Sequence, residues 1–308
     1  MMSADEDIRF VTYLSPSIPQ ALFEALADQV QGVLGRERVS LRVESRVSGP
    51  QKGGECSSFA EEADVAFMCA PSFIWLRDLQ LPPVELLGVL PVFDDERNQG
   101  RPVYFCDVVV RNDGPIHAFS ELEGGSWAYN DACSLSSYYS LLNKLAESGA
   151  GESFFDNIFC SGSHLGSIEA VFSGEADAAA IDSTVLRIRL REVPALHKKL
   201  RVIEAWGPYP IQPVVVRSAL HPELKQRLSA AFLATEQDHR TNRILKQFGL
   251  SRFVTVGQED YTLDPTKTSR YYSLPGNLIA FFRSVGPSRS YTSSAAAPPL
   301  FVQKHPEP

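Results

Sequence analysis

The chain has 308 residues, enough to bury a large core and to form two lobes of ordinary domain size. Hydrophobic residues make up 44% and charged residues 21%, a composition that excludes a largely disordered chain. The formal net charge of −8 argues against a nucleic-acid partner, because such partners require a basic face. No apolar run approaches the ~18 residues of a membrane span, so membrane insertion is not expected either.

Targeting and cofactor signals are also absent from the sequence. The N-terminal stretch MMSADEDIRF is acidic where a signal peptide is basic, which predicts a cytoplasmic protein. A periplasmic or extracellular location is expected only if a leader is missing from the sequence. The five cysteines have no CxxC spacing, the histidines are dispersed, and neither a GxxxxGK[ST] nor a GxGxxG motif occurs. The sequence therefore predicts no metal, no cofactor and no disulfide framework.

Apolar patterning in the first hundred residues predicts strands and one clear helix. The predicted strands are 8–14, 39–47, 65–70 and 84–93, and the predicted helix is 21–34. The stretch from Gly49 to Ser58 reads as a loop. An aromatic segment, Phe73 to Leu76, follows a Pro-Ser turn.

The rest of the chain alternates strands with helices up to Gly286. Predicted strands are 103–110, 126–129, 176–181, 200–206 and 212–216, and predicted helices are 137–146, 168–172, 222–235 and 240–248. Gly207 to Pro210 reads as a rigid turn. Beyond Gly286 the Ser-, Ala- and Pro-rich composition predicts disorder.

This alternation predicts an α/β fold, with a ligand cleft outside the carboxyl ends of the strands. EADVAFMCAPS at 62–72 and EADAAAIDS at 175–183 share an acidic turn, a buried strand and a serine, which suggests two lobes of one plan. Strand 103–110 is long enough to pass from one lobe to the other, and strand 212–216 could be the return crossing. Closure of the lobes is expected to bend the chain near 106–109 and 206–212. We therefore expect lobe 1 at 1–107 plus 208–262, lobe 2 at 108–207, and a C-terminal extension at 263–308.

The stretch Cys160 to Ser183 carries the strongest chemical signal. It opens with a Ser-Gly-Ser-His turn, where Ser163 is a candidate N-cap and His164 the first helical residue. A helix start that carries a hydroxyl and an imidazole favours an anion, because its free N–H groups and the helix dipole attract negative charge. His164 could equally be structural, or act as a base.

A second hydroxyl-rich helix start lies at 131–138. Ser134, Ser136 and Ser137 supply three hydroxyls within four residues, about what a tetrahedral anion requires. Taken alone, this turn could be an ordinary N-cap with spare serines. Beside the turn at His164, the anion interpretation is favoured.

Several other residues could line the cleft. Asp182 follows an apolar strand, and it could cap a local turn or receive an amine of a ligand. Aromatic residues at predicted strand ends or turns could wall the cleft, although each one by itself is more typical of core packing. These aromatic residues are Tyr13, Phe73, Trp75, Tyr104 and Tyr209.

Together these segments resemble the phosphonate-binding PhnD-like family over about residues 8–262. The resemblance rests on SGSHLGSIEAVFSGEADAAAIDS with the flanking RPVYFCDVVVRNDGP, WAYNDACSLSSYYS and LRVIEAWGPYPIQPVVV. It implies a two-lobed type II periplasmic-binding-protein fold that closes over phosphonate, phosphite or phosphate and serves an ABC importer. An ABC permease partner is expected only if the chain is exported.

The resemblance also implies specific ligand contacts. The family's Ser-x-Ser-Gly turn falls on 134–137, its Gly-Ser-His on 162–164, and an acidic residue that meets a ligand amine in some members falls on Asp182. The sequence departs from the family at Leu135, which replaces a hydroxyl residue, and at Ser137, which replaces glycine. Either change could narrow the site or alter the ligand.

Two other functions remain open from the sequence. The first is an enzyme of the thiamine-pyrimidine or menaquinone-pathway type that uses His164, although the cysteine-rich motif of the former is absent. The second is a scaffold acting through the tail after Gly286. Binding of a small oxyanion without chemistry is the leading prediction.

Overall fold

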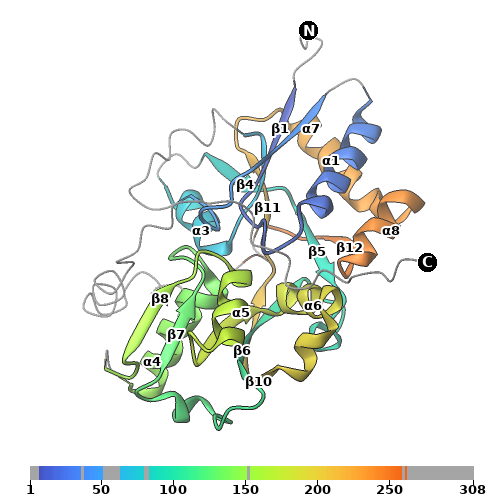
Figure 1. Cartoon of the computed structure of the whole chain (residues 1–308). Helices are drawn as coiled ribbons and strands as arrows, with labels where there is room; N and C mark the ends of the chain where they lie inside the picture. The colour runs from blue at the N-terminus through green and yellow to red at the C-terminus, as the bar shows by residue number, and fades with distance from the viewer. Residues whose placement is uncertain are drawn as a thin grey trace, which may run out of the picture.

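The computed structural model describes residues 7–35, 38–50, 63–79, 83–150, 153–258 and 261. The protein has two lobes, which lie one above the other in Figure 1. Each lobe is built on a five-stranded sheet covered by helices. The architecture is the predicted two-lobed α/β fold of the type II periplasmic-binding-protein class. The predicted tail beyond residue 262, Cys56 and most of the predicted loop at 49–58 lie outside the described residues.

The first lobe has the strand order β2-β1-β3-β11-β4. Its sheet strands are β1 (Ile8–Thr12), β2 (Val39–Val43), β3 (Val65–Phe67), β4 (Val84–Leu86) and β11 (Val214–Arg217). Its helices are α1 (Gln20–Leu34), α3 (Ala70–Arg77), α7 (Pro222–Leu233) and α8 (His239–Gln247). A separate antiparallel pair joins β5 (Val89–Phe93) to β12 (Leu250–Thr255).

The second lobe has the strand order β10-β6-β9-β7-β8. Its strands are β6 (Val103–Arg111), β7 (Ser126–Tyr129), β8 (Asn157–Cys160), β9 (Ala178–Asp182) and β10 (Leu200–Pro210). Its helices are α4 (Ser140–Ser148), α5 (His164–Ser173) and α6 (Ser183–Glu192), and a π-helical turn, Leu135–Tyr139, leads into α4.

The two sheets share one pattern of strand directions. In the first lobe β3 is parallel to β1 and antiparallel to β11, a strand that follows a crossing between the lobes. In the second lobe β9 is parallel to β7 and antiparallel to β6, the strand that follows the other crossing. The two short similar sequences, 62–72 and 175–183, include these matching strands and the helix starts after them, as the similarity suggested.

The chain passes between the lobes twice, from β5 to β6 and from β10 to β11 (Figure 1). The two crossings touch, because the N–H of Ile211 donates to the carbonyl of Pro102 at 3.0 Å. Strands β6 and β10 pair antiparallel along nearly their whole lengths within the second sheet. The exact division of the chain into lobes stays a prediction.

Three predicted elements differ from the structure. The stretch 84–93 forms two strands, because Gly88 breaks it with a φ of 84°. The stretch 207–210 is the end of strand β10 rather than a turn, held there by its pairing with β6 across a register shift. Phe73 to Leu76 forms part of helix α3, which begins with Pro71 in its first turn.

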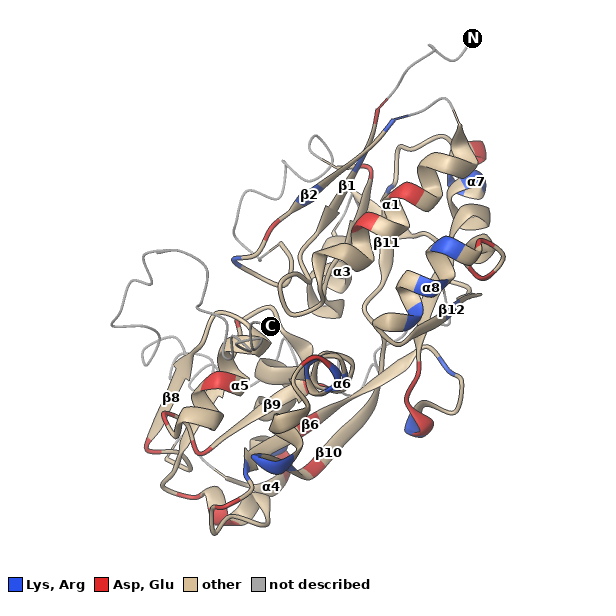
Figure 2. Cartoon of the chain, turned by 45° about the vertical axis from the view of Figure 1, so that its right-hand side comes forward, with Lys and Arg blue, Asp and Glu red and all other residues tan. Residues whose placement is uncertain are grey.

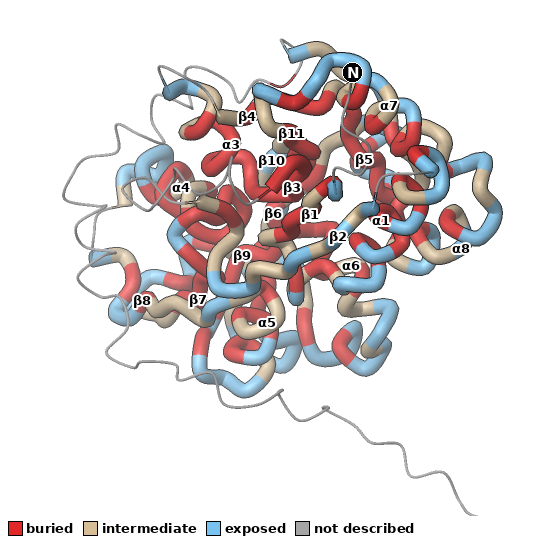
Figure 3. The backbone as a smooth tube through the Cα atoms, turned by 90° about the horizontal axis from the view of Figure 1, so that it is seen from above, coloured by how far each residue is buried: buried red, intermediate tan, exposed pale blue. Residues whose placement is uncertain are grey.

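The core lies where the sheets meet their covering helices, and the helix surfaces that face outward are exposed (Figure 3). In the first lobe α1 buries Leu22, Phe23 and Leu26, at the spacing expected of one helix face. In the second lobe Trp127 is fully buried and packs against Trp206. Charged residues lie mainly on outer helices and loops (Figure 2). None of the described helices is both long and apolar enough to cross a bilayer.

Candidate functional site

A pocket with about 460 Å³ of unfilled space, including its open mouth, lies between the two lobes. Its walls are the loops after β1, β2 and β3 of the first sheet and after β7, β8 and β9 of the second, together with Gln212 of a crossing. It therefore lies at the carboxyl ends of the strands of both sheets, where ligands bind in open α/β sheets. Its polar lining residues are Ser15, Ser17, Ser45, Ser48, Asn130, Asp131, Ser134, Ser136, Ser163, His164, Asp182 and Gln212.

Two helix starts meet at this pocket. Ser134 precedes the π-helical turn and accepts a hydrogen bond from the Ser137 N–H at 3.3 Å, while Ser163 caps α5 and accepts from the Gly166 N–H at 3.0 Å. The predicted N-cap at Ser163 is confirmed, and Ser134 caps the other helix start. One further N–H of each first turn is also occupied, because the Leu135 N–H donates to Cys69 Sγ at 3.3 Å and the His164 N–H donates to Ser17 Oγ at 3.2 Å.

The hydroxyl of Ser136 joins the two helix starts. Its Oγ lies 3.0 Å from Nε2 of His164 and 3.3 Å from Oγ of Ser134, so three predicted site residues form one connected group. The sequence spacing of 28 residues between Ser136 and His164 gave no direct sign of this contact. Parallel pairing of β7 with β8 produces it, because the two helices begin beside each other.

Gly166 allows α5 to begin close to the preceding turn. A Cβ atom at this position would lie 2.5 Å from the carbonyl oxygen of Ser161, a distance that real Cβ contacts essentially never show. The glycine two residues after His164 is thus required for the close packing that aims this helix start at the pocket.

His164 is a neutral imidazole in this setting. Its side chain is buried, and burial lowers its pKa to about 3. Its Nδ1 has no partner among the described residues, whereas Nε2 contacts Ser136. The ring therefore offers the pocket a hydrogen bond rather than a charge.

Two buried carboxylates complete the pocket. Asp131 accepts from the Cys133 N–H at 2.7 Å and from the side chains of Ser48 and Asn130, and burial raises its pKa. Asp182 caps α6 by accepting from the Thr184 N–H at 2.7 Å, and its other oxygen accepts from Gln212. No Lys or Arg is among the described lining residues, so the site holds negative charge without a matching cation.

Asp182 makes the stability of the protein depend on pH. Burial raises its pKa from 3.8 to about 6, so the ionised form is less favourable in the folded chain than in the unfolded one. The resulting loss in the free energy of unfolding is absent below about pH 4, grows as the pH rises to 6, and is complete above that. A pKa difference of about 2 units corresponds to a loss of about 3 kcal/mol.

We expect Asp182→Asn to raise the free energy of unfolding at pH 8 by about 2–3 kcal/mol relative to wild type, because asparagine caps helices without a charge. Urea unfolding of both proteins at pH 4 to 8 measures this. The gain should shrink toward zero at pH 4. A gain that stays constant with pH would contradict the role assigned to the carboxylate.

The structure brings six of the ten predicted site residues to the pocket: Tyr13, Ser134, Ser136, Ser163, His164 and Asp182. The other four are not among the described lining residues. Ser137 is fully buried, and its Oγ accepts from the Asn130 N–H at 2.8 Å. Tyr209 lies on β10 and packs against Tyr104.

Phe73 and Trp75 were expected at a strand end or turn, and this placement is wrong because both lie on helix α3. Phe73 is buried, and its ring contacts Tyr261 edge-on at 5.5 Å. Trp75 packs against the same core. A helical position turns Phe73 into the core instead of leaving it at the end of a strand.

Several lining residues lack a signal in the sequence. Ser17, Ser48, Asn130 and Gln212 are single polar residues in loops, without a motif. Each one nevertheless bonds a residue far along the chain: the His164 N–H donates to Ser17, Ser48 donates to Asp131, and Gln212 donates to Asp182. These contacts join the first lobe and the crossing to the second lobe across the pocket.

Several solved structures share this fold. A binding protein component of an ABC phosphonate transporter from Pseudomonas aeruginosa matches with a TM-score of 0.70 and 16% identity, covering 90% of this chain and 97% of that chain. PhnD1 from Prochlorococcus marinus, solved with methylphosphonate, matches with a TM-score of 0.71 and 17% identity, covering 87% and 98%. At such identities these matches establish the fold.

A family model described as "ABC transporter, phosphonate, periplasmic substrate-binding protein" matches residues 8–261. The predicted cytoplasmic location is therefore wrong, because this family is the periplasmic component of its transporters. Its proteins bind a substrate and are not enzymes, so the enzyme alternative for His164 is not supported. The chain belongs to the family of phosphonate-binding periplasmic substrate-binding proteins of ABC transporters.

Proposed function

We propose that this protein binds a small phosphorus oxyanion, namely a phosphonate, phosphite or phosphate, in the pocket between its lobes. The observation that supports this best is the contact between Ser136 and His164, which joins two helix starts at one point of the pocket. A tetrahedral anion needs several donors that converge, and the hydroxyls and the imidazole at these two helix starts supply them.

The proposed oxyanion site works through dipoles rather than net charge. Ser134, Ser136 and Ser163 contribute hydroxyls, and the neutral ring of His164 contributes one more hydrogen bond. With two carboxylates nearby and no described cation, a singly charged anion fits this pocket better than a doubly charged one. Such an environment favours the singly charged form, which is RPO3H⁻ for a phosphonate and H2PO4⁻ for phosphate.

We propose that ligand binding is coupled to closure of the lobes by bending at the two crossings. The sequence predicts bending near 106–109 and 206–212. However, Cys106–Val109 pair with β9 on one side and β10 on the other, and Trp206, Tyr209 and Pro210 pair with β6. The segments between β5 and β6 and between β10 and β11 lie outside the sheets and are better placed to bend. We accordingly place the lobe boundaries at these segments.

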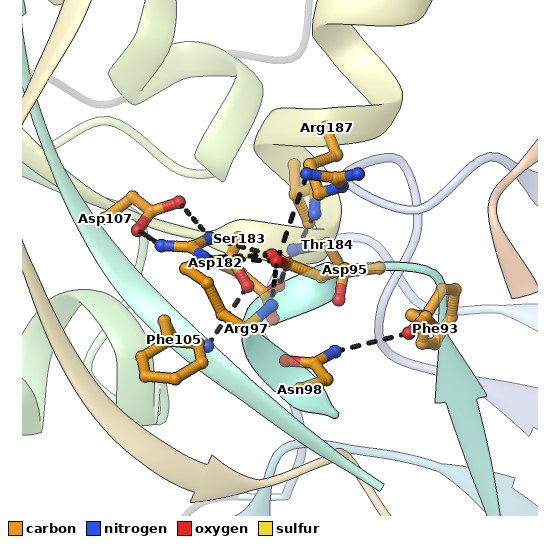
Figure 4. A network of polar contacts seen from close by, with 11 residues as sticks. Phe93, Asp95, Arg97, Asn98, Phe105, Asp107, Asp182, Ser183, Thr184 and Arg187 are labelled. Carbon is orange, nitrogen blue, oxygen red and sulfur yellow. Dashed lines mark hydrogen bonds and ion pairs between the residues drawn. The ribbon is translucent and has the colours of Figure 1, made fainter. Parts of the chain in front are cut away.

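An ionic network holds the first crossing against the second lobe (Figure 4). Arg97 donates to Asp107 on β6 at 2.7 Å and to Asp95 at 2.8 Å, and Arg187 on α6 lies 3.9 Å from Asp95. Bending is therefore expected before Asp95, next to the end of β5. An ABC permease, the membrane partner of this protein family, would receive the ligand from the closed form.

Isothermal titration calorimetry against phosphate, phosphite, methylphosphonate, 2-aminoethylphosphonate and sulfate tests the proposal. We expect at least one phosphorus oxyanion to bind with micromolar affinity or better, about −8 kcal/mol or stronger, and sulfate to bind much more weakly. Sulfate has no proton to offer the carboxylate-rich pocket at neutral pH. Absence of binding across the phosphorus compounds would overturn the proposed ligand class.

A further inference from the structure

One lining residue of the pocket lies on a crossing between the lobes. Gln212 lies between β10 and β11, in the second crossing, and lines the pocket on that side. Ile211 beside it makes two hydrogen bonds: its N–H donates to Pro102, and its carbonyl accepts from the Tyr261 hydroxyl at 2.9 Å. Pro210 and Pro213 flank the pair. These contacts set the point from which the Gln212 side chain leaves the crossing.

The amide of Gln212 has only one orientation that satisfies its neighbour. Its Nε2 donates to Oδ2 of Asp182, and a carboxylate can only accept at this point. The other oxygen of Asp182 already accepts from the Thr184 and Val185 N–H groups. This fixes the amide nitrogen toward Asp182 and leaves the amide oxygen, Oε1, for another partner.

Oε1 of Gln212 is buried and has no partner among the described residues. The residue is only 8% exposed, so bulk water does not readily satisfy this acceptor. Buried acceptors without a donor are unfavourable, and in a ligand pocket the missing donor is most simply a group of the ligand. Both oxygens of Asp182 already accept hydrogen bonds, so the acceptor without a described partner at this wall of the pocket is Oε1 of Gln212.

We propose that Gln212 is a specificity-determining residue: its Oε1 accepts a hydrogen bond from a donor on the substituent of the bound phosphorus oxyanion, and Asp182 positions it. This rests on the proposed function and deepens it. The ligand class is a phosphonate whose organic group carries a hydroxyl or amino hydrogen. Because Gln212 sits on a crossing, the same contact ties the ligand to the segment that bends on closure.

The test compares two ligands that differ by one donor. Hydroxymethylphosphonate and ethylphosphonate have nearly the same shape, but only the first carries an O–H on its substituent. We expect calorimetry of the wild-type protein to give at least a tenfold preference for hydroxymethylphosphonate. In Gln212→Met, which keeps the length of the side chain but lacks the acceptor, the preference should fall below threefold.

Asp182→Asn provides a second variant that should lose the same preference by another route. The new amide N–H₂ faces Gln212, so the Gln212 amide must turn over to accept from it, and its own N–H₂ then faces the pocket. We expect this variant to lose the preference for the hydroxyl ligand while it still binds ethylphosphonate. Its helix cap remains, so the protein should fold.

Asn98→Leu is the matched control. Asn98 is a buried amide of the other crossing, its Nδ2 donates to Phe93 at 3.3 Å, and its Oδ1 also lacks a partner among the described residues. It does not line the pocket, so the variant should keep the wild-type ligand ratio. Equal affinity of the wild-type protein for both ligands, or an unchanged ratio in Gln212→Met, would overturn the role of Gln212 and leave oxyanion binding intact. Failure of every phosphonate to bind the wild-type protein would instead overturn the proposed function, and this inference with it.

Discussion

Ser136→Ala is expected to weaken binding of methylphosphonate by about tenfold to a hundredfold. The hydroxyl lies in the pocket beside Nε2 of His164, and a hydrogen bond to a charged ligand contributes about 1.5–3 kcal/mol. Each 1.4 kcal/mol is a factor of ten in affinity. His164→Ala should weaken binding to a similar degree, because it removes the other half of the link between the helix starts. Calorimetric titration of each variant measures the loss.

The two substitutions should also be coupled. Since Ser136 and His164 touch, the double variant should lose less affinity than the sum of the single losses. Ser137→Ala is the control: its hydroxyl accepts from Asn130 and does not line the pocket, so its affinity should stay within about threefold of wild type. Wild-type affinity in both Ser136→Ala and His164→Ala, with normal thermal unfolding, would exclude this site for the ligand.

Local sequence signals were enough to predict the two helix starts of this site. The N-caps at Ser134 and Ser163 depend on residues within three positions, so the sequence alone identified both helix starts. Their meeting point followed from the general position of ligands at the carboxyl ends of parallel strands. The strand order that brings β7 beside β8 completed the arrangement, and it is a tertiary property.

Residues that contact distant partners were not predictable. Ser48 lies 83 positions from Asp131, and Gln212 lies 30 positions from Asp182. Each is a common polar residue in a loop, and only the tertiary packing around the pocket gives it this partner. Asp131 belonged to a recognised turn, but its carboxylate becomes part of the pocket through Ser48, which the other lobe supplies.

Misplaced elements have identifiable causes. Pro71 could have indicated the start of α3, since proline is favoured in the first turn of a helix, and this would have put Phe73 and Trp75 on a helix. The Gly-Pro-Tyr-Pro stretch contains glycine and proline, two residue types that usually end strands. It remains in β10 because β6 offers a partner of similar length, with a register shift that accommodates it.

Arg97→Leu is expected to lower the free energy of unfolding at pH 7 by about 3 kcal/mol. The guanidinium pairs with Asp95 and Asp107, whose side chains are each 4% exposed, and its removal leaves two buried carboxylates. Removing one partner of a buried ion pair costs about 3–5 kcal/mol, and the lower end applies because the Arg97 side chain is 37% exposed. Arg187, at 3.9 Å from Asp95, compensates only in part. Urea unfolding measures the difference.

The pH dependence of that difference separates the ionic contribution from lost packing against Phe105. Burial alone would raise the pKa of Asp95, but hydrogen bonds from Arg97 outweigh it and hold the pKa below its usual value. A lowered pKa adds stability that is present above about pH 4 and is lost as the pH falls further, so the penalty of Arg97→Leu should shrink below pH 4. Arg46→Gln, which breaks an exposed pair with Glu44, should change stability far less than Arg97→Leu does. A penalty for Arg97→Leu that equals this control at pH 7, or that grows in acid, would show that the network in Figure 4 does not hold the first crossing through charge.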